Sequence, residues 1–319
     1  MKSLHAVAGA LALFLAPTLA SAQTIDTLKI MVPAAPGGGW DQTGKAIEAV
    51  VKAESIAKNV QITHVPGAGG TVGLPQFVNQ WKGQAGSLMV GGMVMAGAIV
   101  ANKSAVKLTD VQPLARLTGE FEVIVVPSNS PHKSMADLVA ALKADPGKVA
   151  WAGGSAGGTD HILVGLIAEA VGVDPTKINY VAYSGGGAAQ AAILGGHVAA
   201  GVSGWGEFAG QIEAGKMRAL AISAGTRTPG LNVPTLKEQG VNVELFNWRG
   251  VFAPPGLKDA DKNALAQAID KMAKSAAWKA ELDKKQWLGI YMPASEFTTY
   301  VAAESKAIEG ILTKLGIAK

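Results

Sequence analysis

Residues 28–41 read LKIMVPAAPGGGWD, an apolar run that ends at Pro33 and passes into a glycine-rich loop. The run at residues 28–32 is typical of a short buried strand. Residues 41–52 follow with Ile47, Val50 and Val51 at helical spacing. The stretch therefore predicts a strand, a glycine loop and a helix in succession, which is the repeating unit of parallel α/β sheets.

Three further glycine-rich stretches repeat this pattern at residues 66–70 (PGAGG), 153–158 (GGSAGG) and 184–187 (SGGG). Glycine lets a backbone approach a small molecule closely, because no Cβ blocks the way and positive φ is allowed. A loop that enters a helix also points unpaired N–H groups outward at the positive end of the helix dipole, which favours anions. None of the four stretches contains Lys or Arg, so a carboxylate is favoured over a multiply charged phosphate.

The glycine stretches fall into two pairs, separated by a strongly apolar predicted strand at residues 121–126. We interpret this as an α/β protein of two lobes, with residues 23–124 and 247–319 in lobe 1 and residues 125–246 in lobe 2. Each lobe presents two loops at the carboxyl ends of its strands, where open sheets bind ligands. Strands at residues 123–126 and 246–251 would cross between the lobes as a hinge. Helices are predicted at residues 259–274, 275–284 and 295–315.

The N-terminus has the pattern of a secretory signal peptide over residues 1–22. Lys2 precedes an apolar run at residues 6–16, and Ala20, Ser21 and Ala22 form a small-residue cleavage site. The run is too short to cross about 30 Å of hydrocarbon. Cleavage after residue 22 would leave 297 of the 319 residues, without any cysteine for a disulfide or a lipid anchor. These features predict a soluble periplasmic protein.

Charge and motifs argue against several classes of function. The net charge of +4, or +3 without Lys2, comes with no basic stripe for nucleic acid. His64, His132, His161 and His197 form no metal-binding pair, and no G-x-G-x-x-G follows a strand. Residues 39–45 nearly match a phosphate-binding loop, but the next residue is alanine instead of the required Ser or Thr. We therefore expect neither a metal nor another cofactor.

Ser155 leaves two functional interpretations open. Residues 153–157 match G-x-S-x-G, the nucleophile motif of many secreted serine hydrolases, with Asp174 and His197 as the remaining triad candidates. However, Gly157 and Gly158 separate Ser155 from the expected helix start, whereas the motif places the helix at the serine. The other interpretation is that the Ser155 hydroxyl hydrogen-bonds a bound carboxylate, or that it is an ordinary turn residue.

Polar residues near the loops have both structural and binding interpretations. Asp41 and Asp160 stand where helices start, which favours an N-cap role for each. Arg116, Arg218 and Arg249 could each grip a carboxylate through two hydrogen bonds or form an ion pair.

Taken in order, the motifs resemble those of a known family. The matching stretches are residues 32–41 (VPAAPGGGWD), 66–73 (PGAGGTVG), 154–161 (GSAGGTDH), 183–186, 194–198, 233–236 and 252–254. The chain resembles the substrate-binding receptors of tripartite tricarboxylate transporters, also called Bug receptors. The resemblance implies a non-enzymatic receptor with the type II periplasmic binding protein fold, which closes over a small organic acid. It also implies membrane subunits of the transporter as partners, and we expect a monomer.

The resemblance also implies a set of binding residues. GGGWD at residues 37–41 is most similar to the tricarboxylate-binding branch, which implies a ligand such as citrate or a dicarboxylate. Lobe 1 would bind the ligand through Gly38, Gly39, Ala68 and Gly69, with Trp40 either in the cleft wall or in the core. Lobe 2 would contribute Ser155, Gly157, Thr159 and His161. Met93, Met95, Ser203 and Trp205 are candidates for contacts with the far end of the ligand.

Overall fold

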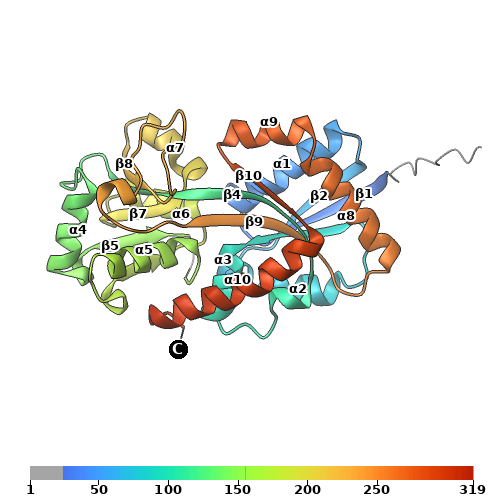
Figure 1. The fold of residues 1–319 in the computed structure, drawn as a ribbon, viewed down its shortest axis with the longest axis horizontal. Coiled ribbons are helices and arrows are strands. Elements are labelled where there is room, and N and C mark those ends of the chain that lie inside the picture. The colour runs from blue at the N-terminus through green and yellow to red at the C-terminus, as the bar shows by residue number, and fades with distance from the viewer. Residues whose placement is uncertain (1–23, 155, 319) are drawn as a thin grey trace, which may run out of the picture.

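The computed structural model describes residues 24–154 and 156–318. Two α/β lobes lie side by side along the longest axis of the protein, and long strands run between them (Figure 1). The predicted signal peptide at residues 1–22 and the side chain of Ser155 lie outside the described residues. Within those residues, no helix is both long enough and apolar enough to span a bilayer.

The elements alternate between strands and helices along most of the chain. The strands are β1 (Ile25–Val32), β2 (Ala57–His64), β3 (Ser87–Gly92), β4 (Gln112–Pro127), β5 (Ala150–Gly153), β6 (Asn179–Ala182), β7 (Ala200–Gly204), β8 (Met217–Ile222), β9 (Phe246–Ala253) and β10 (Leu288–Pro293). The helices are α1 (Gly39–Ala53), α2 (Gly73–Gln80), α3 (Met93–Ala101), α4 (Met135–Ala144), α5 (Thr159–Ala170), α6 (Gly186–Leu194), α7 (Trp205–Glu213), α8 (Asp259–Ala273), α9 (Ala276–Lys285) and α10 (Ala294–Lys314). A 3-10 turn, η1 (Ala68–Gly70), forms part of the second glycine loop.

Both lobes contain a mixed sheet. In the first lobe, β1 pairs in parallel with β2 and β3, and β9 continues the sheet antiparallel to β3. In the second lobe, β5 pairs in parallel with β6 and β7. The parallel strands therefore end at the glycine loops, as the strand–loop–helix pattern predicts, and antiparallel pairing is found around the long strands that link the lobes.

Strand β4 joins the two sheets. Its residues 112–121 pair with β9, and its residues 122–127 pair with β7 or β8. The chain returns to the first lobe just before β9, where the Leu245 N–H donates to the Ser223 carbonyl at 3.0 Å. Two extended segments thus connect the lobes, as expected for the hinge. The division at residues 124 and 247 stays a prediction.

Each lobe has its own hydrophobic core. The first-lobe core packs α1, α2, α3 and the C-terminal helices against both faces of the sheet, with Phe77, Trp248 and Phe252 among its buried residues. The second-lobe sheet is covered on one face by a cluster around Trp151 and on the other by a cluster around Phe208. Burial of large apolar side chains on both faces stabilises a sheet whose parallel strands cannot face water.

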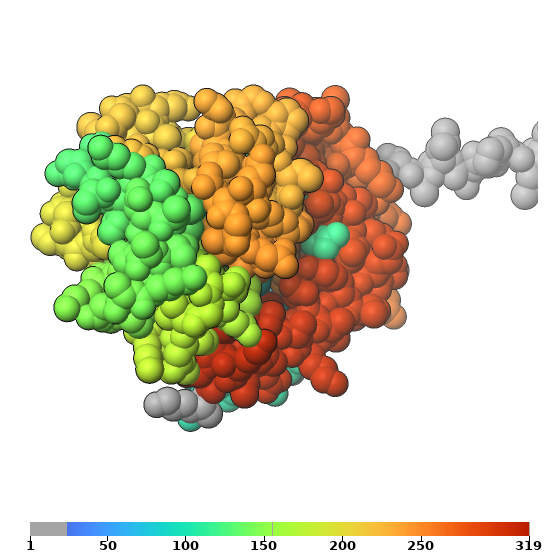
Figure 2. Space-filling view, turned by 60° about the vertical axis from the view of Figure 1, so that its left-hand side comes forward, coloured from blue at the N-terminus to red at the C-terminus, as the bar shows by residue number. Residues whose placement is uncertain are grey.

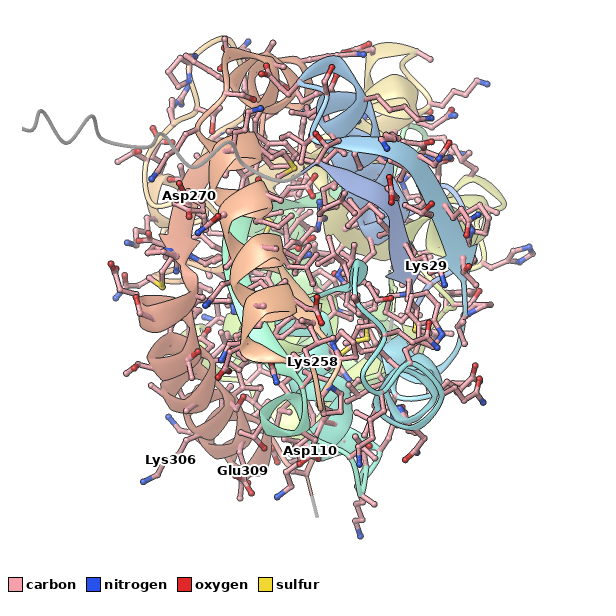
Figure 3. All side chains as sticks on the ribbon, turned by 90° about the vertical axis from the view of Figure 1, so that its right-hand side faces the viewer. Lys29, Asp110, Lys258, Asp270, Lys306 and Glu309 are labelled. Carbon is pink, nitrogen blue, oxygen red and sulfur yellow. The ribbon has the colours of Figure 1, made fainter. Side chains whose placement is uncertain are left out.

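Helix α10 also connects the two lobes. It starts beside the first-lobe sheet and ends against α5, where Lys314 forms an ion pair with Glu169 (Figures 1 and 2). A Cβ on Gly165 in α5 would lie 2.7 Å from Leu315, so the end of α10 packs closely there. Further toward the N-terminus of α10, the charged side chains of Lys306 and Glu309 point into solvent (Figure 3).

The sequence predicted the C-terminal helices and α1 to within a few residues, but it missed three elements. Helix α3 reads MVMAGAIVA, which is apolar on every side, because the helix is buried between elements of the first-lobe core. A helix without a polar face has no period to detect. Helix α7 and strand β10 were also not predicted, and β4 extends further toward its N-terminus than the predicted strand at residues 121–126.

Candidate ligand-binding site

A cavity of about 490 Å³ lies between the lobes, and all four glycine-rich stretches line it. The first-lobe stretches contribute Pro36, Gly38, Gly39, Gly67, Ala68 and Gly69, and the second-lobe stretches contribute Gly154, Ala156, Ser184, Gly185, Gly186 and Gly187. The cavity wall also includes Trp40, Asp160, Ser203, Glu207, Asn247 and Arg249. Loops that are far apart in the sequence therefore surround one small space.

The first glycine loop is braced by Asp41. Gly38 is the N-cap of α1, and Asp41 is the third residue of the helix, so the N-cap role expected for Asp41 is wrong. Its buried carboxylate accepts hydrogen bonds from the Gly37 N–H, Lys45 and His64 at 2.7–2.8 Å. Although burial opposes the change, the bonds from Lys45 and Gly37 hold the pKa of Asp41 below its usual value. Asp41 fixes the loop and leaves the cavity side of Gly38 and Gly39 to the backbone.

The second glycine loop has four consecutive residues with positive φ, from Gly67 to Gly70. A Cβ on Gly67 would lie 2.8 Å from Val72, and a Cβ on Gly70 would lie 2.6 Å from Met95. Both positions therefore require glycine for conformation and for space. The Ala68 carbonyl accepts from the side chains of Thr71 and Asn102 at 2.8 and 3.0 Å, which holds this loop against α3.

The third glycine loop is held by the first turn of α5. Asp160 is the second residue of α5, Gly158 is its N-cap, and so the N-cap role expected for Asp160 is also wrong. The Asp160 carboxylate instead accepts a hydrogen bond from the Gly154 N–H. The Gly157 N–H donates to Nδ1 of His161 at 3.1 Å, and the His161 ring stacks on Tyr180 with centroids 4.0 Å apart. Burial lowers the pKa of His161 to about 4, which keeps the ring neutral and able to accept.

The fourth glycine loop enters α6 through Gly185, whose φ of 140° is in the glycine-favoured region. The next residue, Gly186, packs against the side chains of Ser203 and Glu207. A Cβ on Gly186 would lie 2.5 Å from the Ser203 hydroxyl and 1.7 Å from Oε2 of Glu207. The start of α6 can therefore approach these side chains only as glycine.

A buried cation is among the residues that line the cavity. Arg249, on β9, is 1% exposed and pairs through Nη2 with Glu120 on β4. The other oxygen of Glu120 accepts from the Gly206 N–H of α7 at 2.9 Å. Nε and Nη1 of Arg249 have no hydrogen-bond partner among the described residues. The guanidinium is thus neutralised by Glu120, and two of its nitrogens are buried without a partner.

Glu207 connects the two lobes at the cavity wall. It lies on α7 of the second lobe, and its Oε1 accepts a hydrogen bond from the N–H of Gly39 in the first lobe at 2.9 Å. Its Oε2 is buried and has no hydrogen-bond partner in the described part of the chain. Together with Glu120, Glu122, Asp160 and Arg249, Glu207 forms what we call the charged cluster.

Three acids of the charged cluster, Glu207, Asp160 and Glu122, have pKa values above their usual range. Burial raises the pKa of Glu207 to about 7, and the charge of Glu120 adds to the rise. Burial also raises the pKa of Asp160 to about 6. Glu122 is 0% exposed, and burial followed by the charge of Asp160 raises its pKa well above the ordinary value. One arginine among four carboxyl groups cannot compensate for all of them, so protons offset part of the negative charge.

Six of the predicted binding residues line the cavity, namely Gly38, Gly39, Trp40, Ala68, Gly69 and Ser203. Gly157, Thr159 and His161 lie in the neighbouring turn and first turn of α5, outside the lining residues. Met93, Met95 and Trp205 are at least 94% buried and are also not among the lining residues.

Sequence reasoning missed Glu207 and Glu120 entirely, although Arg249 and Asp160 were candidates. One signal was available: β9 reads FNWRGVFA, in which an arginine interrupts an apolar run. A charge within a buried strand needs a partner or a ligand. Its partner, Glu120, lies 129 residues earlier in the chain, and no local pattern connects the two.

The hydrolase interpretation gains no support from its other two residues. Asp174 accepts from the Thr176 N–H at 3.0 Å in a turn, and His197 packs beside Gly195 at the end of α6. Neither residue lines the cavity to which Gly154 and Ala156 contribute. Among the described residues, no three His, Cys, Asp or Glu side chains lie where they could hold a metal ion together.

Residues 47–317 match the family model described as the tripartite tricarboxylate transporter family receptor. The chain belongs to this family and is a solute receptor. It is 30% identical over 211 residues to the UPF0065 protein in gbd 5'region of Cupriavidus necator, covering 66% of this chain and 63% of that relative, which is less than two thirds of its length. It is 28% identical over 313 residues to Protein BugT of Bordetella pertussis, covering 94% and 93% of the two chains.

Solved structures share the fold. The periplasmic binding protein BugD aligns with a TM-score of 0.81 at 20% identity, over 92% of this chain and 99% of that one. MatC from Rhodopseudomonas palustris, with bound malate, aligns with a TM-score of 0.79 at 24% identity, over 90% and 99%. A second R. palustris protein, with adipate, aligns with a TM-score of 0.81 at 21% identity, over 92% and 98%. The predicted two-lobed fold is confirmed.

Proposed function

We propose that this receptor binds a small di- or tricarboxylate, such as citrate, between its lobes in the periplasm. We further propose that it acts as a monomer and delivers the ligand to the membrane subunits of a tripartite tricarboxylate transporter. The observation that carries the proposal is the arrangement of four glycine-rich loops, two from each lobe, around one cavity of about 490 Å³. Pockets for small molecules typically measure roughly 300–1,000 Å³.

The chemistry of the cavity wall suits a carboxylate. Helices α1 and α6 both begin at the cavity, at Gly39 and Gly186, and the N–H groups of a first helical turn have no partner within the helix. Of these, the Gly39 N–H already donates to Glu207. The positive ends of both helix dipoles thus point toward the same space. Arg249 adds unpaired donors at Nε and Nη1. Malate and adipate in two structural neighbours support the choice of dicarboxylates in the test set.

Binding between the lobes would favour the closed arrangement. A Cβ on Gly97 in α3 would lie 1.9 Å from the Gly157 carbonyl oxygen, so the lobes already touch beside the cavity. A ligand that contacts both lobes stabilises this arrangement only by its higher affinity for the closed state than for the open state. The closed protein would then present a surface that combines both lobes to the transporter.

Thermal unfolding of the purified protein with a panel of organic acids tests the proposal. The panel contains malate, succinate, adipate, citrate and tricarballylate, with acetate and glucose as controls. A ligand at about 100 times its dissociation constant should stabilise the folded protein by roughly 2.7 kcal/mol. The expected result is a higher melting temperature with at least one di- or tricarboxylate. Stabilisation by glucose but by none of the acids would contradict the proposal.

A further inference from the structure

The carboxyl group of Glu207 lies between the starts of two helices that belong to opposite lobes. Its Oε1 accepts from the N–H of Gly39, the first residue of α1, at 2.9 Å. Its Oε2 packs against Gly186, the first residue of α6, because a Cβ there would lie 1.7 Å away. In the second lobe, Gln190 of α6 donates to the backbone carbonyl of Glu207 at 3.0 Å. The side chain thus reaches from α7 across the boundary between the lobes.

Helix α1 therefore receives its N-terminal hydrogen bond from the other lobe. Its N-cap is Gly38, which has no side chain and forms no capping hydrogen bond. An unpaired N–H at a helix start is commonly satisfied by a side chain close by in the sequence. The Gly39 N–H is instead satisfied by a residue 168 positions away. Separating the lobes would leave this N–H to water and would uncover Glu207.

The other contacts between the lobes have a different character. In one, Gly97 of α3 packs against the backbone of Gly157, since a Cβ on Gly97 would lie 1.9 Å from the Gly157 carbonyl oxygen. This contact contains no titratable side chain. In another, Lys314 and Glu169 form an ion pair that is largely exposed to solvent. Glu207 differs from both, because its titratable group is shielded from water and bonded across the lobes.

The surroundings of Glu207 favour a neutral carboxyl group. Its Oε2 is buried without a hydrogen-bond partner among the described residues, and a charge there would be poorly solvated. Burial, followed by the charge of Glu120, raises the pKa of Glu207 to about 7, which outweighs the opposite effect of the Gly39 hydrogen bond. The ionisable groups around it are Glu120 and Glu122 on β4, Asp160 on α5, Arg249 on β9 and, beyond them, Lys285 on α9.

We propose that Glu207 is a proton-dependent latch, which holds the lobes together while its carboxyl group is neutral and releases them when it ionises. In the closed protein, the neutral group accepts from α1 without the cost of a buried charge. When the lobes separate, water reaches the carboxyl group and makes ionisation favourable. Closing therefore takes up a proton from solvent, and opening returns it. The inference goes beyond the proposed function, because the latch acts without any ligand.

The direction of the pH dependence follows from this difference between the two states. The closed state binds the Glu207 proton more tightly than the open state, in which the pKa is nearer the ordinary value of 4.5. The contribution of the latch to closure is therefore fully present below about pH 4.5 and is lost as the pH rises through about 7.

Single-molecule energy transfer between two dyes measures the ratio of closed to open protein without ligand. The chain contains no cysteine, so Ala49→Cys on α1 and Gly210→Cys on α7 place one dye on each lobe. Both positions are exposed, and a Cβ on Gly210 would meet nothing within 4 Å. The labelled mature receptor is unfolded and refolded before the measurement, which removes any bound acid.

Two substitutions of Glu207 separate its role as an acceptor from its charge. Glu207→Gln keeps an oxygen for the Gly39 N–H and cannot ionise, so it should stay closed from about pH 5 to about pH 8. Glu207→Met keeps the length but offers only a weak acceptor, so its closed-to-open ratio at about pH 5 should be roughly tenfold lower than in the unmodified receptor. The unmodified receptor should lose at least about tenfold in this ratio between pH 5 and pH 8. Glu213→Gln, exposed on the same helix α7, is the matched control and should behave like the unmodified receptor.

A closed-to-open ratio that stays constant between about pH 5 and pH 8 in the unmodified receptor would overturn the inference. An unchanged ratio in Glu207→Met would also overturn it, and a lower melting temperature of that variant would then assign Glu207 a structural role within the second lobe. If Glu207→Met does not fold, the comparison with Glu207→Gln decides, because a pH dependence that persists in Glu207→Gln contradicts the latch. Each of these outcomes leaves the proposed function intact, since the thermal panel of organic acids tests it separately.

Discussion

The loops around the cavity and the charged cluster beside them present different chemical groups. The loops present glycine, alanine and serine, and their binding groups belong to the backbone. The charged cluster places an arginine and four acids in surroundings where a charge without a partner is costly. The difference teaches that the loops supply backbone groups around the cavity, whereas the cluster places ionisable side chains beside it.

The largest effect should come from breaking the ion pair of the charged cluster. Arg249→Met leaves Glu120 buried without its cation, and removing one partner of a buried pair costs about 3–5 kcal/mol of unfolding free energy. Urea denaturation without ligand measures this cost. The double variant Arg249→Met, Glu120→Gln should recover a large part of the loss. A loss of less than about 1 kcal/mol in the single variant would mean that the pair does not hold the cluster together.

The next effect should appear where the loop and the cluster touch. Gly39→Ala places a methyl group 2.3 Å from Nη2 of Arg249, and overpacking of this kind costs about 1–3 kcal/mol. Gly38→Ala is the matched control, because its Cβ would meet nothing within 4 Å. Denaturation of the unliganded proteins compares the two. Equal stability of both variants would show that the loop is free to move away from the cluster.

A smaller effect concerns pH. The pKa of Glu207 rises from 4.5 to about 7 on folding, so the folded state binds this proton more tightly than the unfolded state. The contribution of Glu207 to stability is therefore present below about pH 4.5 and is lost as the pH rises to about 7. Unfolding free energies at about pH 5, 6, 7 and 8 should decline less steeply in Glu207→Gln than in the unmodified protein. Parallel curves would show that Glu207 is ionised throughout this range.

The smallest effect should be found far from the cavity, where α10 meets the second lobe. Lys314→Ala removes an ion pair with Glu169 that is largely exposed to solvent. Such pairs contribute less than about 1 kcal/mol, so the melting temperature should barely change and ligand affinity should stay the same. A clear change in ligand affinity would show that the end of α10 controls closure of the lobes.

The contrast between the glycine loops and the charged cluster also explains which parts of the site could be predicted from the sequence. The loops were predictable because glycine stretches between a strand and a helix are local patterns, and Gly38, Gly39, Ala68 and Gly69 all line the cavity. The charged cluster was not predictable, because Glu120, Glu207 and Arg249 come together only through the pairing of β4 with β9 and the packing of α7. The two aspartates were placed near helix starts correctly, but their carboxylates brace the glycine loops instead of capping their helices.

The central claim is that N–H groups from both lobes bind the carboxylate of one organic acid. Glycine-selective ¹⁵N labelling allows a direct test by NMR titration with the acid that stabilises the protein most in the thermal panel. We predict that amide signals shift for glycines of all four loops, including Gly39, Gly69, Gly154 and Gly186, at one common dissociation constant. Shifts confined to the loops of a single lobe, or none at a concentration where calorimetry detects binding, would contradict the account.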